Sequence, residues 1–439
     1  MQKVLVIAYY FPPMGLSGVQ RTLKFVKYLP AFGWEPTVLT VEHRNYFASD
    51  ESLLRELDNL PVNIIRTKSI DPFHFRKKSA KAGLPSGRSH SLLSKLSQAV
   101  FIPDNKIGWK RHAVKRAKET LSETKFDLIF ATAPPYTAFL IGAELKAALN
   151  APLVFDYRDA WLENPLHLYP TPMHRLKHRS LERKALRSAD HVVTINRVIK
   201  ESILRNYPSL SHSDVSIIPQ GFDAEDFRHS GEGSPGRKLR ILHSGTFYYN
   251  RTPRYFFQAL KSLIEEIPEA ASRIEAVFLG TWRDSDNKLI EQYGLGEVVR
   301  VRGYLPHTEC VAEIAASDVL WLIIGSGEGA EMMSTGKLYE YIGAEKPILA
   351  CIPEGTAKRT LKKHGAAYFA EPESVEAIHL ALKKIYGQWK QRQLPSPAPG
   401  FASAFERKTL TGNLAKLFSS LTRIEEHARP VSPENFSSD

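Results

Sequence analysis

The stretch from residue 334 to residue 350 reads STGKLYEYIGAEKPILA, and it predicts a loop, a short helix and then a buried strand. The helix would begin at a Thr-Gly step, with Lys337 in its first turn and Glu340 one turn further in. Free backbone N–H groups and the positive end of the helix dipole make such a start a binding place for phosphate. The plain alternative is an ordinary capped helix with an acid in its first turn.

Strand-like apolar runs alternate with helical patterns along the whole chain. The run Val4–Tyr10 is continuous, which is typical of a parallel strand buried on both faces. The other runs of the first half are Thr37–Val41, Asn63–Arg66, Asp127–Ala131, Leu153–Tyr157, His191–Ile195 and Val215–Ile218. Those of the second half are Leu239–His243, Ala276–Leu279, Val298–Gly303, Val319–Ile324, Pro347–Ile352 and Ala367–Phe369. This alternation predicts two open, doubly wound parallel sheets of the α/β class.

The length of 439 residues exceeds what one hydrophobic core usually serves, so we expect two domains. Residues 226–238 have the polar, Gly- and Pro-containing composition of a linker. We therefore expect an N-terminal domain at 1–225 and a C-terminal domain at 239–400, with a helix at about 401–425 that packs back on the first. The carboxyl ends of both sheets would face a central cleft, where ligands bind in folds of this class.

The chain is basic, and the excess of positive charge is localised. Its formal net charge is +12, and residues 76–118 hold twelve Lys and Arg against the acid Asp104, a contribution of +11. A nucleic-acid partner would suit this charge. However, the sequence carries no nucleic-acid motif that we recognise and the charge is not spread over both halves, so we expect no such partner.

The cysteines and the first residues of the chain indicate the cellular compartment of the protein. Cys310 and Cys351 lie in apolar contexts, which argues against a disulfide framework. The first residues are too short and too strand-like for a signal peptide, and no apolar run approaches the roughly 20 residues of a membrane span. We therefore expect a cytoplasmic protein.

The loop after the first strand reads PPMGLSG at residues 12–18. A dinucleotide-dependent oxidoreductase would carry a G-x-G-x-x-G pattern at this place. Gly15 and Gly18 have a different spacing, so the sequence disfavours that class of enzyme.

Six short motifs lie in order along the chain. They are GLSGVQR at 15–21, IPQGFD at 218–223, HSGT at 243–246, VRGYLP at 301–306, ASDV at 316–319 and KLYEY at 337–341. In this order and at these spacings they resemble the family-four glycosyltransferases, and the resemblance covers most of the chain. It implies a retaining enzyme of the GT-B fold, in which two doubly wound Rossmann-like domains face a central cleft.

The resemblance implies a nucleoside-diphosphate sugar donor held mostly by the second domain, with the first domain on the acceptor side. Glu340 would accept hydrogen bonds from the ribose hydroxyls. Arg251 would offset charge on the leaving diphosphate, although locally it reads equally well as a surface arginine beside Pro253. The remaining donor-binding positions are Thr335, Gly336 and Lys337 at the distal phosphate, Tyr304 and Leu305 at the base, Gly18 on the opposite side of the phosphates, and Gly245 and Thr246 in the first loop of the second domain.

The chain departs from the family pattern at three places. Many relatives carry two glutamates separated by seven residues in the donor loop, but here Met332 stands at the first position and Glu331 one residue off. Thr246 stands where a basic residue often follows the glycine. Arg158 replaces a histidine at the end of the fifth strand and cannot act as a base. It would bind acceptor, with Asp159 as the carboxylate nearest the chemistry, or the two would form a buried ion pair.

The reaction implied by the resemblance is transfer of a hexose-type sugar, with retention, to a glycan or lipid-linked acceptor in surface polysaccharide or glycolipid synthesis. The departing phosphate would take the acceptor proton, and we expect no cofactor and no obligatory metal. Two alternatives stay open. One is a GT-B nucleotide-sugar epimerase or phosphorylase, and the other is a sugar-nucleotide-binding module without turnover.

The basic block at 76–118 predicts contact with an anionic membrane surface. Residues 91–102 place Leu92, Leu93, Leu96, Ala99 and Val100 on one helical stripe, with cations on both sides and Trp109 among the second group. A peripheral helix lies in a headgroup layer through such a pattern. The alternative is a solvated basic loop whose leucines pack on the core of the first domain.

Overall fold

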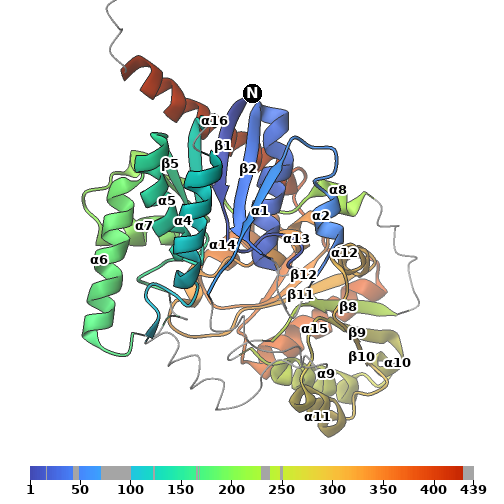
Figure 1. Ribbon diagram of the computed structural model, residues 1–439. Helices are drawn as coiled ribbons and strands as arrows, with labels where there is room; N and C mark the ends of the chain where they lie inside the picture. The colour runs from blue at the N-terminus through green and yellow to red at the C-terminus, as the bar shows by residue number, and fades with distance from the viewer. Residues whose placement is uncertain are drawn as a thin grey trace, which may run out of the picture.

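The computed structural model describes the whole chain except residues 16, 43–48, 71–99, 122–123, 165–166, 168, 229–237, 248–250 and 429–439. It contains two α/β domains, each built on one parallel sheet (Figure 1). The fold predicted from the alternating apolar runs is confirmed.

The first sheet has the strand order β3-β2-β1-β4-β5-β6-β7, and all of its pairings are parallel. The strands are β1 (Gln2–Ile7), β2 (Trp34–Val41), β3 (Asn63–Thr67), β4 (Leu128–Ala133), β5 (Leu153–Tyr157), β6 (His191–Thr194) and β7 (Val215–Ile217). The chain reverses its winding direction beside β1, which pairs with β2 on one side and β4 on the other. Such a switch point places a crevice at the carboxyl ends of these strands.

The second sheet repeats this design with the order β10-β9-β8-β11-β12-β13. Its parallel strands are β8 (Leu239–Ser244), β9 (Ile274–Leu279), β10 (Val299–Gly303), β11 (Val319–Ile323), β12 (Ile348–Cys351) and β13 (Ala367–Ala370). The switch point lies at β8, between β9 and β11. The loops after β8 and β9 therefore open toward the same crevice as the first sheet.

Helices cover both faces of the two sheets (Figure 1). We call the connection between β7 and β8, residues 218–238, the hinge. The helices up to and within the hinge are α1 (Ser17–Tyr28), η1 (Leu29–Phe32), α2 (Ser52–Arg55), α4 (Ile107–Leu121), α5 (Thr137–Leu149), α6 (Pro172–Ser188), α7 (Arg197–Asn206), η3 (His212–Asp214) and α8 (Ala224–Phe227). Those of the second domain are α9 (Arg254–Glu266), α10 (Ala270–Arg273), α11 (Asp284–Tyr293), α12 (His307–Ala315), η4 (Ala330–Met332), α13 (Gly336–Gly343), α14 (Thr356–His364) and α15 (Val375–Lys390). No helix of the described residues is long and apolar enough to cross a membrane.

The chain crosses between the domains twice, and the two crossings touch. The Phe222 N–H donates to Phe405 O (3.1 Å), and the Arg407 N–H donates to Phe222 O (2.8 Å). A Cβ on Gly221 would lie 2.3 Å from Phe405 O, so this close approach requires glycine. After the second crossing, which includes η5 (Ala402–Phe405), α16 (Arg407–Ala428) packs against α1 and adds its apolar face to the first core.

Trp109 and its neighbours correct part of the membrane prediction. The Trp109 side chain is fully buried, its indole N–H donates to Thr67 Oγ1 (2.7 Å), and its ring packs edge-on against Tyr9. The expectation that Trp109 is an aromatic residue at a membrane interface is wrong, because the apolar side of α4 directs it into the core. Most of the predicted apolar stripe lies outside the described residues, except Val100, whose side chain is 71% exposed.

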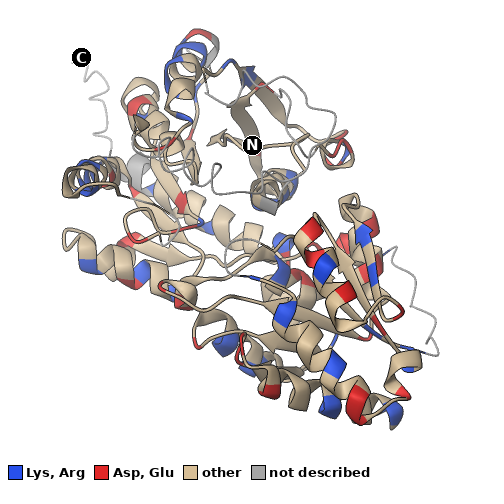
Figure 2. Cartoon of the chain, turned by 90° about the horizontal axis from the view of Figure 1, so that it is seen from below, with Lys and Arg blue, Asp and Glu red and all other residues tan. Residues whose placement is uncertain are grey.

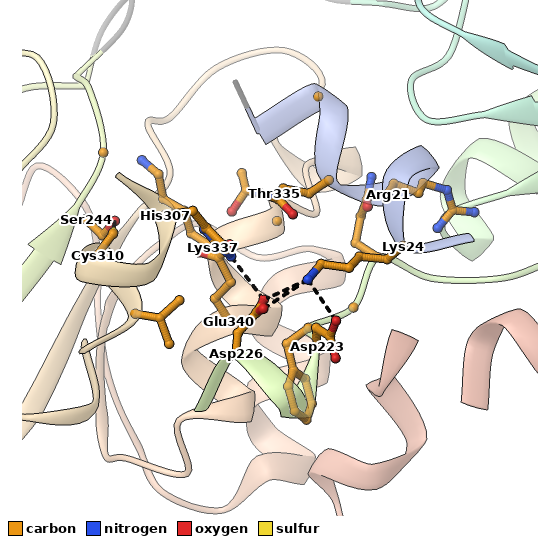
Figure 3. Close-up of a pocket in the computed structure, with 18 of the residues that line it drawn as sticks. Arg21, Lys24, Asp223, Asp226, Ser244, His307, Cys310, Thr335, Lys337 and Glu340 are labelled. Carbon is orange, nitrogen blue, oxygen red and sulfur yellow. Dashed lines mark hydrogen bonds and ion pairs between the residues drawn. The ribbon is translucent and has the colours of Figure 1, made fainter. Parts of the chain in front are cut away.

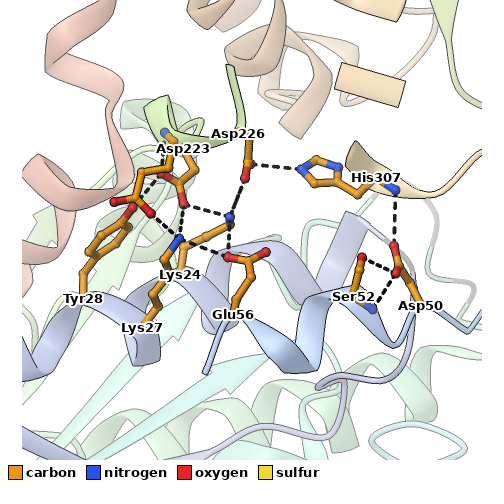
Figure 4. Close-up of polar contacts among 10 residues, drawn as sticks. Lys24, Lys27, Tyr28, Asp50, Ser52, Glu56, Asp223, Asp226 and His307 are labelled. Carbon is orange, nitrogen blue, oxygen red and sulfur yellow. Dashed lines mark hydrogen bonds and ion pairs between the residues drawn. The ribbon is translucent and has the colours of Figure 1, made fainter. Parts of the chain in front are cut away.

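A buried polar cluster joins α1 to the hinge and to the second domain (Figure 4). The Lys24 ammonium lies 2.7 Å from both Glu56 and Asp223 and 2.9 Å from Asp226. Asp226 is also 3.0 Å from His307 Nε2 at the start of α12. Burial lowers the pKa of Lys24, but Asp226, Glu56 and Asp223 outweigh that effect, so the pKa is raised and the side chain is charged.

Replacing Lys24 by methionine removes the more deeply buried of the two ammonium groups in this cluster with little change in volume. Lys27, 3.0 Å from Asp223 and 3.2 Å from Glu56, and His307 beside Asp226 then remain to offset three carboxylates. We expect the free energy of unfolding to fall by about 3–5 kcal/mol, the usual effect of breaking a buried ion pair from one side. Lys115, whose side chain is 74% exposed, provides the matched control, and Lys115→Met should change stability by less than about 0.5 kcal/mol. Denaturant titrations of both variants measure the difference, and equal stabilities would contradict the structural role of Lys24.

Candidate active site

A cleft of about 460 Å³ lies between the carboxyl ends of the two sheets. Figure 3 shows Lys337, Glu340 and Thr335 on the side of the second domain, opposite Arg21 and Lys24 on α1. All of the residues predicted for the site line this cleft except Arg251. They are Gly18, Arg158 and Asp159 from the first domain and Gly245, Thr246, Tyr304, Leu305, Thr335, Gly336, Lys337 and Glu340 from the second.

The N-terminus of α13 opens into the cleft. Thr335 has extended backbone and precedes Gly336, the first residue of the helix. The space beside Gly336 is open, since a Cβ there would meet no atom within 4 Å. The Thr335 hydroxyl is buried and has no hydrogen-bond partner among the described residues. Backbone N–H groups, the helix dipole and this hydroxyl together provide a site for an anion.

The position of α13 is fixed by the end of β8. The Ser244 N–H donates to the buried Tyr341 hydroxyl (2.8 Å), which ties the helix to the strand. Gly245 follows with φ +125°, and a Cβ at this position would lie 1.7 Å from Lys337 Nζ. Residue 245 must therefore be glycine, because any side chain there would clash with the Lys337 side chain that lies across the loop.

Lys337 and Glu340 carry opposite charges on the cleft side of α13. Burial, followed by the charge of Arg251, lowers the pKa of Lys337 to about 8. Burial, together with Glu340, raises the pKa of the nearby Cys310 thiol to about 12, so this thiol stays protonated and is no nucleophile. The Cys310 sulfur instead contacts Ser244 Oγ at 3.1 Å. The chemistry available here is electrostatic rather than nucleophilic.

Arg251 lies beside the loop that precedes α13 and is not among the residues that line the cleft. Its Nη2 donates to Met333 Sδ (3.4 Å), two residues before Thr335, and its charge acts on Lys337. The three residues that precede it, 248–250, are outside the described part of the chain.

Arg158 is held by backbone carbonyls rather than by Asp159. Its guanidinium donates to Gly18 O, Pro134 O and Ala133 O, the last at 3.3 Å. Burial lowers the pKa of Arg158. Asp159 is exposed on the cleft wall. The two side chains thus lie next to each other on the wall, with Arg158 fixed and Asp159 open to solvent.

Tyr304 spans the cleft in this conformation. Its hydroxyl donates to Gly15 O (3.1 Å) in the first domain, and the side chain is 49% exposed. A second contact between the domains lies close by, where the His307 N–H donates to Asp50 Oδ2 (3.2 Å). Leu305 is partly buried against the core of the second domain.

Several cleft residues were not among those predicted from the sequence. Arg21 ends the GLSGVQR motif and had no predicted role in the site, yet its guanidinium is fully buried and donates hydrogen bonds to Asp156 at 2.8 to 3.2 Å. Arg407, at the start of α16, lines the cleft, and its buried Nη1 has no hydrogen-bond partner among the described residues. No local pattern around residue 407 distinguishes it from the other basic residues of a helix.

Among the described residues, one acidic sequence and one spatial cluster of acids suggest a metal site, and neither lies free in the cleft. One is Asp284-Ser285-Asp286, in which buried Asp286 pairs with Arg283 (2.8 Å) outside the cleft lining. The other is Glu56 with Asp223 and Asp226, whose oxygens lie within 4.8 Å of one another. There the Lys24 ammonium occupies the position of a cation. Glu331, considered for the missing donor-loop glutamate, is exposed and does not line the cleft.

Solved structures share this fold from end to end. Anabaena HepE, solved in complex with UDP-glucose, has 16% identity and a TM-score of 0.61 over 96% of this chain and 100% of that chain. Sucrose-phosphate synthase of Thermosynechococcus elongatus has 15% identity and a TM-score of 0.62 over 98% and 100% of the two chains. The lipopolysaccharide outer core galactosyltransferase WaaB has 14% identity and a TM-score of 0.57 over 96% and 100%. At these identities the likeness is one of fold.

Sequence comparison identifies the family. The chain is 24% identical over 225 residues to an uncharacterized glycosyltransferase of Methanocaldococcus jannaschii, a match that spans 48% of this chain and about half, 55%, of that relative. The family Glycosyltransferase Family 4 matches residues 17–226, and Glycosyl transferases group 1 matches residues 225–396. The two matches together run across both domains and the cleft between them, and the chain belongs to the family-four glycosyltransferases of the GT-B type.

Proposed function

We propose that the protein transfers a hexose-type sugar, with retention, from a nucleoside diphosphate to a glycan or lipid-linked acceptor. The observation that carries this proposal is the open N-terminus of α13, where Lys337 and the unpartnered Thr335 hydroxyl face the cleft one turn from Glu340. A diphosphate and a ribose are the chemical groups that such a set of donors and acceptors would bind.

Each group of the donor would meet a distinct part of the cleft. The distal phosphate would accept from the N–H groups of Gly336 and Lys337, and the ribose hydroxyls would donate to Glu340. The base would lie against Tyr304 and Leu305, after the contact between Tyr304 and Gly15 opens. Gly18, Gly245 and Thr246 would allow backbone to approach the phosphates.

The reaction would proceed by cleavage of the bond between the sugar C1 and the diphosphate oxygen. The acceptor hydroxyl would form its new bond to C1 from the face that the diphosphate leaves, and the departing phosphate would take the hydroxyl proton. Negative charge develops on the leaving oxygen, so Arg251 and Lys337 would contribute most by stabilising it. Arg158 and Asp159 would bind acceptor on the opposite wall.

Two structural neighbours bear on the choice of donor and acceptor. WaaB acts on lipopolysaccharide by its name, and HepE was solved with UDP-glucose. These neighbours support UDP-sugars as the first donors to test and a lipid-linked surface glycan as the acceptor, reached by an enzyme that docks reversibly at a membrane. An epimerase or phosphorylase would use the same donor cleft, and an inactive module would bind donor without releasing nucleoside diphosphate.

The Glu340→Gln substitution tests the donor site. A panel of nucleotide sugars should raise the melting temperature of the wild type for at least one base, and this donor should bind Glu340→Gln more weakly by about 1–3 kcal/mol. Glu345→Gln, at an exposed position five residues on, provides the matched control. Isothermal titration gives both affinities, and equal donor binding by all three proteins would remove the ribose role of Glu340.

Arg251→Ala separates binding from chemistry. If Arg251 stabilises the departing diphosphate, the substitution should lower kcat about 100-fold and change the donor KM much less. Both constants can be measured without an acceptor, by following the release of nucleoside diphosphate as the enzyme slowly hydrolyses the donor. Arg254→Ala, exposed in the first turn of α9, should leave kcat near the wild-type value. A change confined to KM would restrict Arg251 to ground-state binding.

Lys337 should make donor binding depend on pH. Its pKa of about 8 in the empty cleft means that the ammonium is lost above this pH, whereas a bound diphosphate favours the charged form. Donor affinity should therefore be constant below about pH 7 and fall by up to tenfold per pH unit above about pH 8. Calorimetry in buffers of different ionisation enthalpy should detect proton uptake on binding at pH 9. Lys337→Met should abolish both effects, and a persisting pH dependence would assign it to another group.

A further inference from the structure

Helix α6 presents an exposed face that combines apolar and basic side chains. Met173 and Leu176, almost one turn apart, are 66% and 59% exposed. The helix lies at the outer edge of the first domain (Figure 1). Five exposed cations share its outer side: Lys177, Arg179, Arg183, Lys184 and Arg187.

The helical repeat gives the position of each of these α6 side chains around the helix axis. At 100° per residue, Met173, Leu176 and Arg187 fall on the middle of the outer face. Arg179 and Arg183 fall on one side of that line, and Lys177 and Lys184 on the other. The result is an apolar first turn, with cations on both flanks of the face and Arg187 on its midline at the other end of the helix.

The acid of this helix points the other way. Glu182 is 2% exposed and accepts a hydrogen bond from the Tyr207 hydroxyl (2.8 Å) in the interior of the domain. Its neighbours on the inner face, His178, Ala185 and Leu186, are also buried. The outer face of α6 therefore carries no negative charge.

Within the described part of the chain, the three lysines of α4 lie near carboxylates, unlike the outer cations of α6. On α4, Lys110 lies 2.9 Å from Glu144, and Lys115 lies 3.7 Å from Glu119. On α6, Arg175 at the edge lies 3.5 Å from Glu163. Among the described residues, none of the five outer cations of α6 forms an ion pair. Lys and Arg lie close to Asp and Glu along the chain on other helices of the molecule (Figure 2).

The apolar end of α6 lies on the same side of the sheet as the cleft. Strand β5 ends at Tyr157, Arg158 and Asp159 then line the cleft, and the connection continues to the first turn of α6 with Met173. The first turn of α6 therefore lies at the carboxyl edge of the first sheet, the edge that also carries Arg158 and Asp159.

We propose that the outer face of α6 docks on an anionic membrane surface. Met173 and Leu176 would enter the boundary between headgroups and acyl chains, while the flanking cations would contact lipid phosphates. A nucleic acid would satisfy the cations but would leave the apolar first turn without a partner, so the bilayer is the favoured occupant. The biological reason for docking rests on the proposed lipid-linked acceptor, whereas docking itself requires no donor.

Co-sedimentation of the full chain with lipid vesicles tests the proposal. Wild type should bind phosphatidylcholine vesicles that contain phosphatidylglycerol, bind pure phosphatidylcholine far less, and be released by salt. Replacement of Arg179, Arg183 and Lys184 by glutamate should lower the affinity at least about 100-fold, and Met173→Ser with Leu176→Ser about tenfold. The matched control replaces Lys115, Arg116 and Lys118 on α4 by glutamate, with the same change in net charge. It should retain most of the binding.

The outcomes separate the alternatives. Equal losses in the α4 and α6 charge variants, or equal binding to neutral and anionic vesicles, would overturn the assignment to α6. If the α6 variants lost binding to an RNA oligonucleotide but kept binding to vesicles, membrane docking through α6 would be wrong and a nucleic acid would be the partner of this face. Melting temperature and UDP-glucose binding, measured on every variant, distinguish loss of folding or of the donor site from loss of docking. A chain that docks through α6 and binds no nucleotide sugar would reject the proposed function and leave the docking surface intact.

Discussion

The two-domain arrangement depends on the buried charge of Lys24. Its ammonium is supplied by α1, and two of its three carboxylate partners, Asp223 and Asp226, come from the hinge. A charge taken out of water must be met by opposite charge at short distance, otherwise the group is strongly destabilising. Because α1 also begins at the edge of the cleft, near Gly18, the ion cluster fixes the hinge and one wall of the site together.

The cations of the cleft divide into those with structural partners and those directed at a ligand. Arg21 is satisfied by Asp156 and by the carbonyls of Ile218 and Pro219, and Arg158 by carbonyls of its own domain. Lys337 is different, because the charge of a second cation, Arg251, adds to the effect of burial in lowering its pKa. Two neighbouring cations that disfavour each other in the empty site gain most when a diphosphate arrives. The family pattern has a basic residue where Thr246 stands, and Lys337, lying across Gly245, occupies the adjoining space.

The sequence was sufficient for the sheets and for most of the cleft. Strands such as β1 and β4 are buried on both faces, so they appear as continuous apolar runs, and the loops at their carboxyl ends locate the site. The burial of Trp109 could not be predicted from the sequence, because an aromatic residue among cations occurs both in protein cores and at membrane interfaces. The Lys24 cluster was invisible because its members are far apart in the sequence, at residues 24, 56, 223 and 226. Arg407 was not predicted as a cleft residue for the same reason, since only the return of α16 across the hinge brings it to the cleft.

The two basic surfaces of the first domain show why net charge is a poor guide to binding. The block at 76–118 has the larger excess of positive charge, and it first suggested a membrane contact. In the folded chain, however, Glu144 approaches two cations of α4, Lys110 and Lys118, and Trp109 is in the core. Helix α6 has an acid as well, but Glu182 is turned inward, where Tyr207 binds it. An anionic surface interacts with the field that remains after such local pairing, and side chains paired within a few ångströms contribute little to that field. The direction in which one glutamate points therefore decides how much of the charge of a helix is available to a partner.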